Sequence, residues 1–443
     1  MPFSHAFQNI ATMKRFFLLA VTAIICFMPF ISKAQEHEIN KDQYAGLGKA
    51  ASAIFFSDKR YSVSGFGELN YVHYPPGGIN KNSNDLELYY TNLYRLSGFF
   101  GYKISKNIIF NSEIMVEYLH EGSNESHHEI AIEAYLDFIL NKNFNARVGL
   151  MPLPIGYINS NDEPVLFYSV NRPEVERLII PSTWIELGAM LYGKIVPDLH
   201  YFAGVSGGLN SKDFTSGTWI RNGRPFDIKF PNSVSYNAQL IYNGVKNTQL
   251  SVSGYYGPTS QGETISTING TQESFKANVG VISGYAKYEY DRFRLIMMGT
   301  YGRLGDTEKI FELTKNDENG QGEVLGKETY GAYIETGYDI LPFFMKKHKS
   351  VDGKREKGLF KKSEFELPLF VRYERLNTHS DIAESLKQYN RIENNMQILT
   401  VGANFKPQED IVFKINYQFR NNLYNGSGIK ESNILEFGIG FNY

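Results

Sequence analysis

The sequence predicts an all-β protein: a transmembrane, antiparallel, up-and-down β-barrel of about sixteen strands with one long loop folded into its interior. Three observations lead to this prediction. Apolar and polar residues alternate with a period of two over segments long enough to cross a bilayer. The 443 residues include 30 Tyr, 32 Phe and 40 Gly, a composition that favours strands. After the N-terminal stretch no run of 18 apolar residues occurs, so only a closed barrel could satisfy the backbone in lipid.

Composition also excludes several classes of protein. With 45 Lys and Arg against 47 Asp and Glu, the net charge is −2 and no basic block exists, so no nucleic-acid partner is expected. A single cysteine excludes a disulfide scaffold and a multi-cysteine zinc site. The chain lacks a Walker-type phosphate loop, an HExxH zinc helix and a GxSxG nucleophile elbow. We therefore expect neither a metal nor another cofactor.

The N-terminus is predicted to be a secretory signal peptide over residues 1–34. Lys14 and Arg15 precede an apolar stretch over residues 16–31, and a small-x-small ending leads to cleavage between Ala34 and Gln35. A membrane anchor is the alternative, but the stretch is shorter than the ~20 residues that a spanning helix needs.

Met13, directly before the basic pair, is a candidate for the true start of the chain. Cleavage would leave 42 positive and 47 negative groups and no cysteine. Residues 35–60 would then form a periplasmic N-terminal segment, and residues 61–443 would form an outer-membrane β-barrel.

The strands are predicted in order from the alternation. In residues 86–102, Leu, Tyr and Phe occupy the even positions except Asn92 and Gly98. Residues 108–118 and 130–140 repeat this pattern with Glu or Asp at odd positions. A helix would scatter these apolar residues around its whole circumference, so a strand is favoured. The segments begin near Tyr61, Asp85, Asn107, His128, Phe144, Ile185, Leu199, Ser233, Thr248, Phe275, Arg292, Glu328, Glu364, Glu393, Ile411 and Ser432.

The connections between these segments alternate between short and long. Bacterial outer-membrane barrels have short periplasmic turns and long external loops, so both termini are predicted to be periplasmic. One connection, residues 343–363, falls on the short-turn side yet is long and rich in Lys and Arg. We interpret it as a solvated periplasmic turn.

Charged residues at inward positions are the predicted pore lining. They are Arg95, Glu113, Glu117, Glu129, Glu133, Asp137 and Arg147. Symmetric pairing across the turn at 103–106 places Arg95 opposite Glu113, and the turn at 141–143 places Asp137 opposite Arg147.

A matching register between the third and fourth strands would place acids opposite acids, which destabilises a sheet. The resulting pairs are Glu113 with Asp137, Glu117 with Glu133, and Glu121 with Glu129. Either this register is shifted by two residues, another element supplies positive charge, or water in the lumen solvates the acids.

Several stretches resemble the porins of Bacteroidetes-type bacteria, which are related to the phosphate-selective porin O/P group. They are residues 65–68 (GFGE), 149–156 (GLMPLPIG), 180–188 (IPSTWIELG) and 371–374 (VRYE). The C-terminal strand ends on Tyr443 and resembles the assembly signal of outer-membrane barrels. The resemblance extends over residues 61–443.

This resemblance implies a passive diffusion channel among outer-membrane lipids, commonly a homotrimer. It also implies insertion by the barrel assembly machinery through the C-terminal aromatic strand. It does not imply phosphate selectivity, because that group lines its pore with Lys and Arg, whereas the clearest inward positions here are acidic.

The segment 152–184 contains five prolines, which exclude a regular central strand, and it is longer than an ordinary hairpin loop. By resemblance, it is expected to fold inward and constrict the channel. Its charged candidates are Asp162, Glu163, Arg172, Glu174 and Arg177. We expect Arg172 or Arg177 to reach towards Glu117 and Glu133 on the wall.

The predicted function is therefore that of an outer-membrane porin, not an enzyme, which admits small hydrophilic solutes or ions. One alternative is an outer-membrane barrel enzyme of the lipase or deacylase type, although no Ser/His/acid arrangement is recognisable. Another is a non-conducting adhesin or structural barrel, which a conductance measurement would distinguish.

Overall fold

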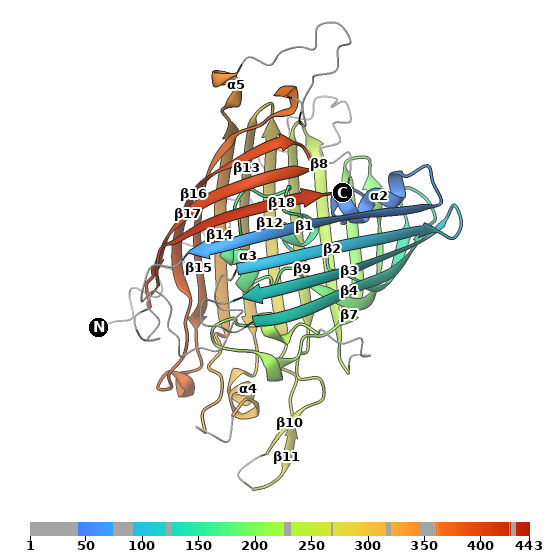
Figure 1. Cartoon of the computed structure of the whole chain (residues 1–443). Coiled ribbons are helices and arrows are strands. Elements are labelled where there is room, and N and C mark those ends of the chain that lie inside the picture. Colours follow the sequence, from blue (N-terminus) through green and yellow to red (C-terminus); the bar gives the residue numbers. More distant parts are fainter. Residues whose placement is uncertain are drawn as a thin grey trace, which may run out of the picture.

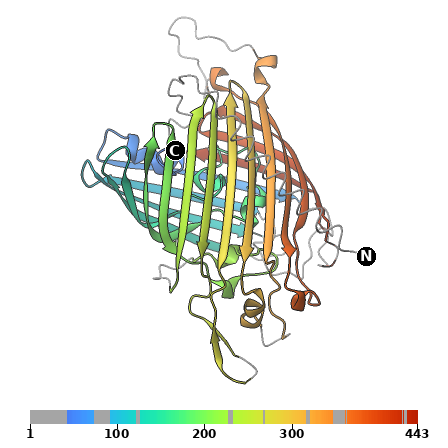
Figure 2. The same cartoon turned by 180° about the vertical axis from the view of Figure 1, so that it is seen from behind.

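The computed structural model describes residues 43–73, 92–120, 126–225, 232–266, 269–315, 320–345, 360, 362–424, 426 and 431–443. The predicted signal peptide with its Ala34–Gln35 cleavage site, and most of the basic insert 343–363, lie outside the described residues. Sixteen long strands close into one antiparallel barrel, and β1 pairs with β18 to complete it (Figure 1, Figure 2). The predicted fold class is confirmed.

The barrel strands have the following bounds: β1 (Tyr61–His73), β2 (Asn92–Lys103), β3 (Ile108–His120), β4 (Ser126–Ile139), β5 (Asn145–Pro152), β6 (Ile185–Val196), β7 (Leu199–Gly207), β8 (Val234–Val245), β9 (Thr248–Gly257), β12 (Val279–Tyr290), β13 (Phe293–Leu304), β14 (Glu328–Asp339), β15 (Pro368–Asp381), β16 (Asn395–Gln408), β17 (Ile411–Asn422) and β18 (Ile434–Asn442).

The remaining elements lie in the connections and before β1: α2 (Lys49–Phe56), η2 (Ile158–Ser160), α3 (Glu174–Leu178), η3 (Ser211–Asp213), η4 (Arg221–Gly223), the hairpin β10 (Thr264–Ser266) and β11 (Gln272–Ser274), α4 (Thr307–Leu313), α5 (Leu341–Phe344), η5 (Lys362–Glu364) and η6 (Glu384–Leu386). No helix in the described part of the chain is long and apolar enough to span a membrane.

The two faces of the sheet reverse the polarity of a soluble protein. Outward side chains are apolar and exposed, as with Leu69 at 53% and Ile114 at 58%. Inward side chains include fully buried charges, as with Arg95 and Asp137. An apolar outer band around a polar interior is the arrangement of a barrel in lipid.

Most strands begin within two residues of the predicted positions, and two begin four residues later. The strand predicted near Asp85 is described from Asn92 onward, and residues 74–91 lie outside the described residues. The strand predicted near Phe275 begins at Val279, because Ala277 has a positive φ of 46° that interrupts the extended backbone. The strand predicted near Glu364 begins at Pro368, because Glu364 belongs to the 3-10 turn η5.

We call the end of the barrel with the short connections the turn end, and the opposite end the loop end. Two-residue turns at 246–247 and 291–292 join their strands directly, and both place an Asn or Asp at positive φ. Asn247 has φ 59° and Asp291 has φ 54°, a conformation that these residues tolerate and that suits tight hairpins.

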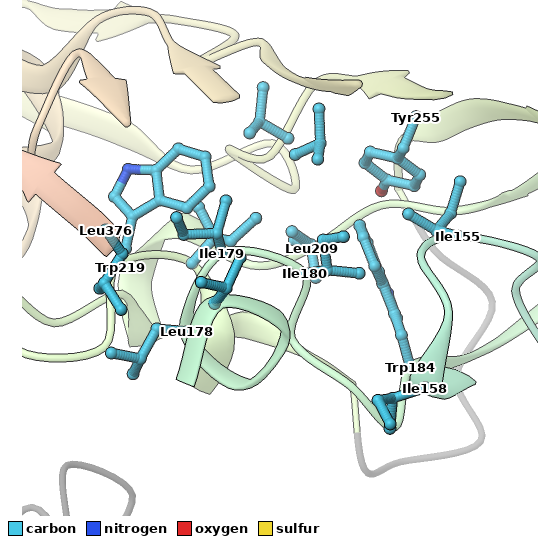
Figure 3. Close-up of a cluster of buried hydrophobic side chains, with 14 of the residues drawn as sticks. Ile155, Ile158, Leu178, Ile179, Ile180, Trp184, Leu209, Trp219, Tyr255 and Leu376 are labelled. Atoms are coloured by element: carbon cyan, nitrogen blue, oxygen red, sulfur yellow. The ribbon is translucent and has the colours of Figure 1, made fainter. Parts of the chain in front are cut away.

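The large apolar core lies inside the barrel. The connection between β5 and β6, residues 153–184, folds inward and buries its apolar residues; we call it the inward loop. Figure 3 shows Ile179, Ile180 and Trp184 of this loop beside Trp219 of the β7–β8 connection and Tyr255 of β9. The loop predicted to enter the barrel does so.

Candidate functional site

The inward loop is closed on itself by a buried carboxylate. Glu176 of α3 accepts hydrogen bonds from the main-chain N–H groups of Tyr157 (2.8 Å) and Ile158 (2.7 Å) and from the Tyr333 hydroxyl of β14 (2.7 Å). Burial raises the pKa of Glu176 to about 7, even though these donors favour its charged form. The carboxylate therefore joins both limbs of the loop to the wall.

Basic residues of the barrel wall hold the deepest part of the loop, residues 162–169, which we call the loop tip. Lys406 of β16 donates to the Val165 carbonyl at 3.1 Å, and Lys414 of β17 donates to the carbonyls of residues 167 and 169, each at 2.9 Å. Arg294 of β13 donates to the Leu166 carbonyl at 2.7 Å. These cations replace the water that would otherwise solvate main-chain carbonyls.

Glycines on the inner wall make room for the same segment. A Cβ added at Gly337 of β14 would lie 2.5 Å from the Tyr168 ring, and one at Gly440 of β18 would lie 2.5 Å from Pro164. These contacts leave no space for any larger side chain, so the wall is shaped to accept the loop.

Helix α3 is fixed by a second charge cluster. Glu174 binds Arg177 at 2.7 Å and Arg420 of β17 at 2.9 Å, and Arg420 also binds Glu431 at 3.1 Å. Of the two arginines expected to reach towards Glu117 and Glu133, Arg177 is thus placed beside Glu174, and Arg172 shares a cleft with Glu117.

Arg95 of β2 is the centre of a third charge cluster inside the barrel. It is fully buried and binds Glu68 at 2.8 Å, Asp162 of the loop tip at 3.2 Å and Glu117 at 3.8 Å. Arg172 of the inward loop approaches Asp162 at 3.7 Å. One cation therefore joins two wall strands to the inward loop.

The predicted registers around this cluster are partly wrong. Arg95 pairs across the sheet with Glu117 and not with Glu113. Between β3 and β4, Glu113 faces Glu133 and Glu117 faces Glu129, a shift of four residues from the predicted partners. The pairing of Asp137 with Arg147 is as predicted.

The first of these errors originates in the β2–β3 turn. The Ser105 N–H donates to the Ile108 carbonyl, and the Ser105 hydroxyl accepts from the Asn107 N–H, so the turn occupies more residues than symmetric pairing assumed. Across the next short turn the Asn141 side chain accepts from the N–H groups of Asn143 and Phe144, both at 2.9 Å. That side-chain turn explains why the Asp137–Arg147 prediction succeeds.

The structure divides the predicted site residues into separate groups. Glu113 and Glu133 are buried and face each other, and the Ser97 hydroxyl donates to Glu113. Asp137 binds Arg147 at 3.0 Å near the turn end. The remaining acids and bases lie around the Arg95 cluster, at the loop tip or on α3, as described above.

A cleft towards the loop end brings together acids and bases that face each other. It has room of about 100 Å³. Glu117 of β3 and Glu129 of β4 line one side, and Arg172, Arg221 and Arg224 line the other. In this cleft, predicted wall acids and a predicted loop cation share a cavity.

Arg221 and Arg224 were missed by the sequence analysis. Arg221 donates to the carbonyls of Arg177 (3.0 Å) and Ser182 (2.8 Å), and Arg224 donates to that of Thr183 (2.8 Å). Both are therefore held by the inward loop itself. A signal was available in the apolar pair Trp219-Ile220 just before them, which is unusual for a solvated loop.

The chemistry of the site concerns fixed charges and not reactive groups. In the described residues no group of three or more His, Cys, Asp or Glu side chains could hold a metal ion. The acids and bases named above are bound to one another or to the backbone, so they define an electrostatic profile along the interior.

Comparisons with known proteins support the architecture. No family model matches the chain. An uncharacterized protein of Aquifex aeolicus (strain VF5) is 29% identical over 395 residues, which cover 84% of this chain and 79% of the relative.

Two solved structures align over 86% of this chain and 97% of their own chains, both at 11% identity. The complex of Salmonella typhi OmpF with daunomycin has a TM-score of 0.52, and the outer membrane channel DcaP of Acinetobacter baumannii has a TM-score of 0.50. At this identity the likeness concerns the fold, which is a porin-like barrel of sixteen strands.

Proposed function

We propose that the chain is an outer-membrane porin, a passive diffusion channel for small hydrophilic solutes or ions, and not an enzyme. The observation that carries the proposal is a closed barrel with an apolar exterior, whose interior holds buried charged side chains and is narrowed by the inward loop. A barrel that only anchored or adhered would have no use for opposed fixed charges in an internal cleft.

The cleft formed by Glu117, Glu129, Arg172, Arg221 and Arg224 is the proposed selectivity region. Opposed charges across a narrow aqueous passage create a transverse field, in which acids favour cations and arginines favour anions. The cleft is lined by three bases and two acids. We propose that its preference for cations or anions depends on whether a solute passes along the acidic or the basic side, and not on a uniform charge.

The orientation follows from the connections. Short turns are periplasmic in bacterial barrels, so the turn end and both termini are proposed to lie in the periplasm. Assembly as a homotrimer, insertion by the barrel assembly machinery and kinship with the phosphate-selective porin O/P group remain proposals that rest on the sequence resemblance.

Planar-bilayer recording on refolded protein tests the function. A channel gives discrete conductance steps whose reversal potential shifts in a salt gradient. Absence of steps, in protein shown to be folded by heat-dependent migration on detergent gels, would leave the adhesin or structural barrel. Turnover of lipid esters or acyl chains by the same preparation would instead support the enzyme.

A further inference from the structure

The N-terminal segment, residues 43–57, lies inside the barrel at the turn end. Figure 1 shows its helix α2 at the same end of the barrel as the C-terminus. Its residues Leu47, Ala50, Ala51 and Ile54 are buried. Leu47, Ala50 and Ala51 pack in one cluster with inward side chains of β1, β2 and β4 to β7, which are Phe66, Phe99, Tyr135, Met151, Met190, Tyr192 and Phe202.

Polar groups of the barrel wall also bind this segment. The Ser64 hydroxyl of β1 donates to the Ala50 carbonyl at 2.7 Å, and the Asn111 amide of β3 donates to the Ala51 carbonyl at 2.6 Å. Arg147 of β5 donates to the Ala45 carbonyl at 3.4 Å. The segment thus covers the wall from β1 to β7.

Two further contacts connect the segment to the β16–β17 turn and to the loop tip. Lys49 forms ion pairs with Glu409 (2.6 Å) and Asp410 (3.3 Å) at the β16–β17 turn, which is on another part of the rim. Glu163 of the loop tip accepts a hydrogen bond from the Ala50 N–H at 2.6 Å, and the Asn442 amide of β18 also donates to it.

The contact with Glu163 completes the helix. Gly48 is the N-cap of α2 and supplies no capping side chain, so the carboxylate of the loop tip takes that role. An isolated helix of eight residues is not stable in water, so α2 depends on these contacts for its structure. The N-terminal segment and the loop tip meet at Glu163, and together they cover the turn end of the barrel.

We propose that residues 43–57 are a plug that closes the turn end of the channel, and that passage of solutes requires this segment to leave its place. The inference rests on the proposed channel function. Residues 43–57 leave together, because helix α2 loses its N-terminal cap when the hydrogen bond from the Ala50 N–H to Glu163 breaks. Lys49 acts as an outer latch, since its partner Glu409 is 75% exposed.

A redox-controlled lock tests the plug directly. A Cβ added at Gly101 of β2 would lie 2.4 Å from the Ile54 Cβ, so a small displacement of the helix end gives the roughly 3.8 Å that a disulfide needs. The one native cysteine, Cys26, lies in the predicted signal peptide. In the I54C/G101C variant we expect conductance to be low when oxidised and to rise when a reductant is added to the same membrane.

Removing the contacts of Lys49 and Glu163 should have the opposite effect and favour the open channel. In Lys49→Ala combined with Glu163→Ala, we expect the ratio of open to closed time to rise about tenfold, the change expected from loss of one helix cap. Lys387→Ala is the matched control, because it removes an exposed ion pair with Glu384 (2.6 Å) at the loop end. That variant should conduct like the unaltered protein.

The outcomes separate the plug from the channel. If the oxidised, reduced, unlatched and control proteins all conduct alike, the plug is wrong and the channel function stands. If none of them conducts, the channel function is wrong and the plug falls with it. Each protein is first shown to be folded by heat-dependent migration on detergent gels, so that a failure to fold is not taken for loss of conductance.

Discussion

Arg95 on β2 and Asp162 in the inward loop form an ion pair of 3.2 Å, although 67 residues separate them in the chain. Arg95 simultaneously binds Glu68 of β1 at 2.8 Å. A single buried guanidinium therefore joins the inward loop to β1 and β2 of the barrel wall. Its removal would take from Glu68 and Glu117 the cation that they bind, whereas Asp162 would keep Arg172 at 3.7 Å.

We expect Arg95→Ala to lower the free energy of unfolding by about 3–5 kcal/mol, the cost of breaking a buried ion pair from one side. Thermal unfolding in detergent, followed by the loss of the fast-migrating form on gels, measures the effect. Lys309→Ala is the control, because it removes an exposed pair with Glu273, and exposed ion pairs contribute little to stability. Equal losses in the two variants would contradict a central role for Arg95.

The charges that line the cleft predict the direction in which each substitution shifts ion selectivity. Glu117→Gln with Glu129→Gln should lower the preference for cations, and Arg172→Gln should raise it, because each change removes one side of the transverse field. Reversal potentials in a salt gradient measure both shifts. They should shrink at high salt, where the screening length falls to about 3 Å at 1 M.

The matched control for this selectivity experiment is Glu384→Gln in the exposed turn η6, which should not move the reversal potential. Glu133, which was first expected to act with Glu117, is buried against Glu113 and is therefore not part of the double variant. Unchanged reversal potentials in both sets would show that these charges only stabilise the loop.

The buried carboxyl group of Glu163 predicts that docking of the plug depends on pH. Burial raises its pKa to about 7, while the Ala50 N–H, Asn442 and Lys49 favour the charged form and Asp162 opposes it. Release of α2 would expose the carboxyl and return its pKa towards about 4.3. The docked state thus binds the proton more tightly, so docking is favoured at low pH and weakens as the pH rises through about 7.

We therefore expect conductance to rise between about pH 5 and about pH 8, and Glu163→Gln to remove most of that rise. The other charged groups at this contact are Lys49, Asp162, Glu409 and Asp410, and the Gln variant leaves all four in place. Bilayer recording across this range is the measurement. A pH profile that is identical in the variant would exclude Glu163 as its origin.

The two tryptophans of the chain report on the inward loop. Trp184 and Trp219 are both fully buried in the interior core, and their indole N–H groups donate to Glu186 (3.0 Å) and the Gly326 carbonyl (3.1 Å). We expect a blue-shifted emission that acrylamide quenches poorly. Trp184→Ala should lower the free energy of unfolding by about 3–5 kcal/mol. Efficient quenching in the folded protein would show that the loop lies outside the barrel.

The number of strands and the identity of their two faces could be predicted, because a period of two is a local property of the sequence. Ile114 and Arg95 each lie on the face that the alternation assigned. Register was less accessible, since it depends on how many residues a turn takes up. The Ser105 turn shifted Arg95 from Glu113 to Glu117.

Contacts between residues far apart in the sequence were the other feature that could not be predicted. Arg221 and Arg224 lie in a connection without periodicity, and only the packing of Trp219 inside the barrel brings them to the cleft. Residues 43–57 were predicted only as a segment that precedes the barrel, because no pattern in eight helical residues indicates which wall they will bury against. Both features depend on tertiary contacts that local patterns do not encode.

The inward loop also constrains the order in which the protein assembles. It leaves the chain after β5, yet Asn171 binds Glu436 of β18 at 2.6 Å, and the Val170 N–H donates to Asn416 of β17 at 2.7 Å. These partners are separated by 265 and 246 residues. Contacts of such high sequence separation form late in folding. The inward loop therefore reaches its final position only after β17 and β18 are in place, so the interior of the barrel cannot be finished before the C-terminal strands have joined the sheet.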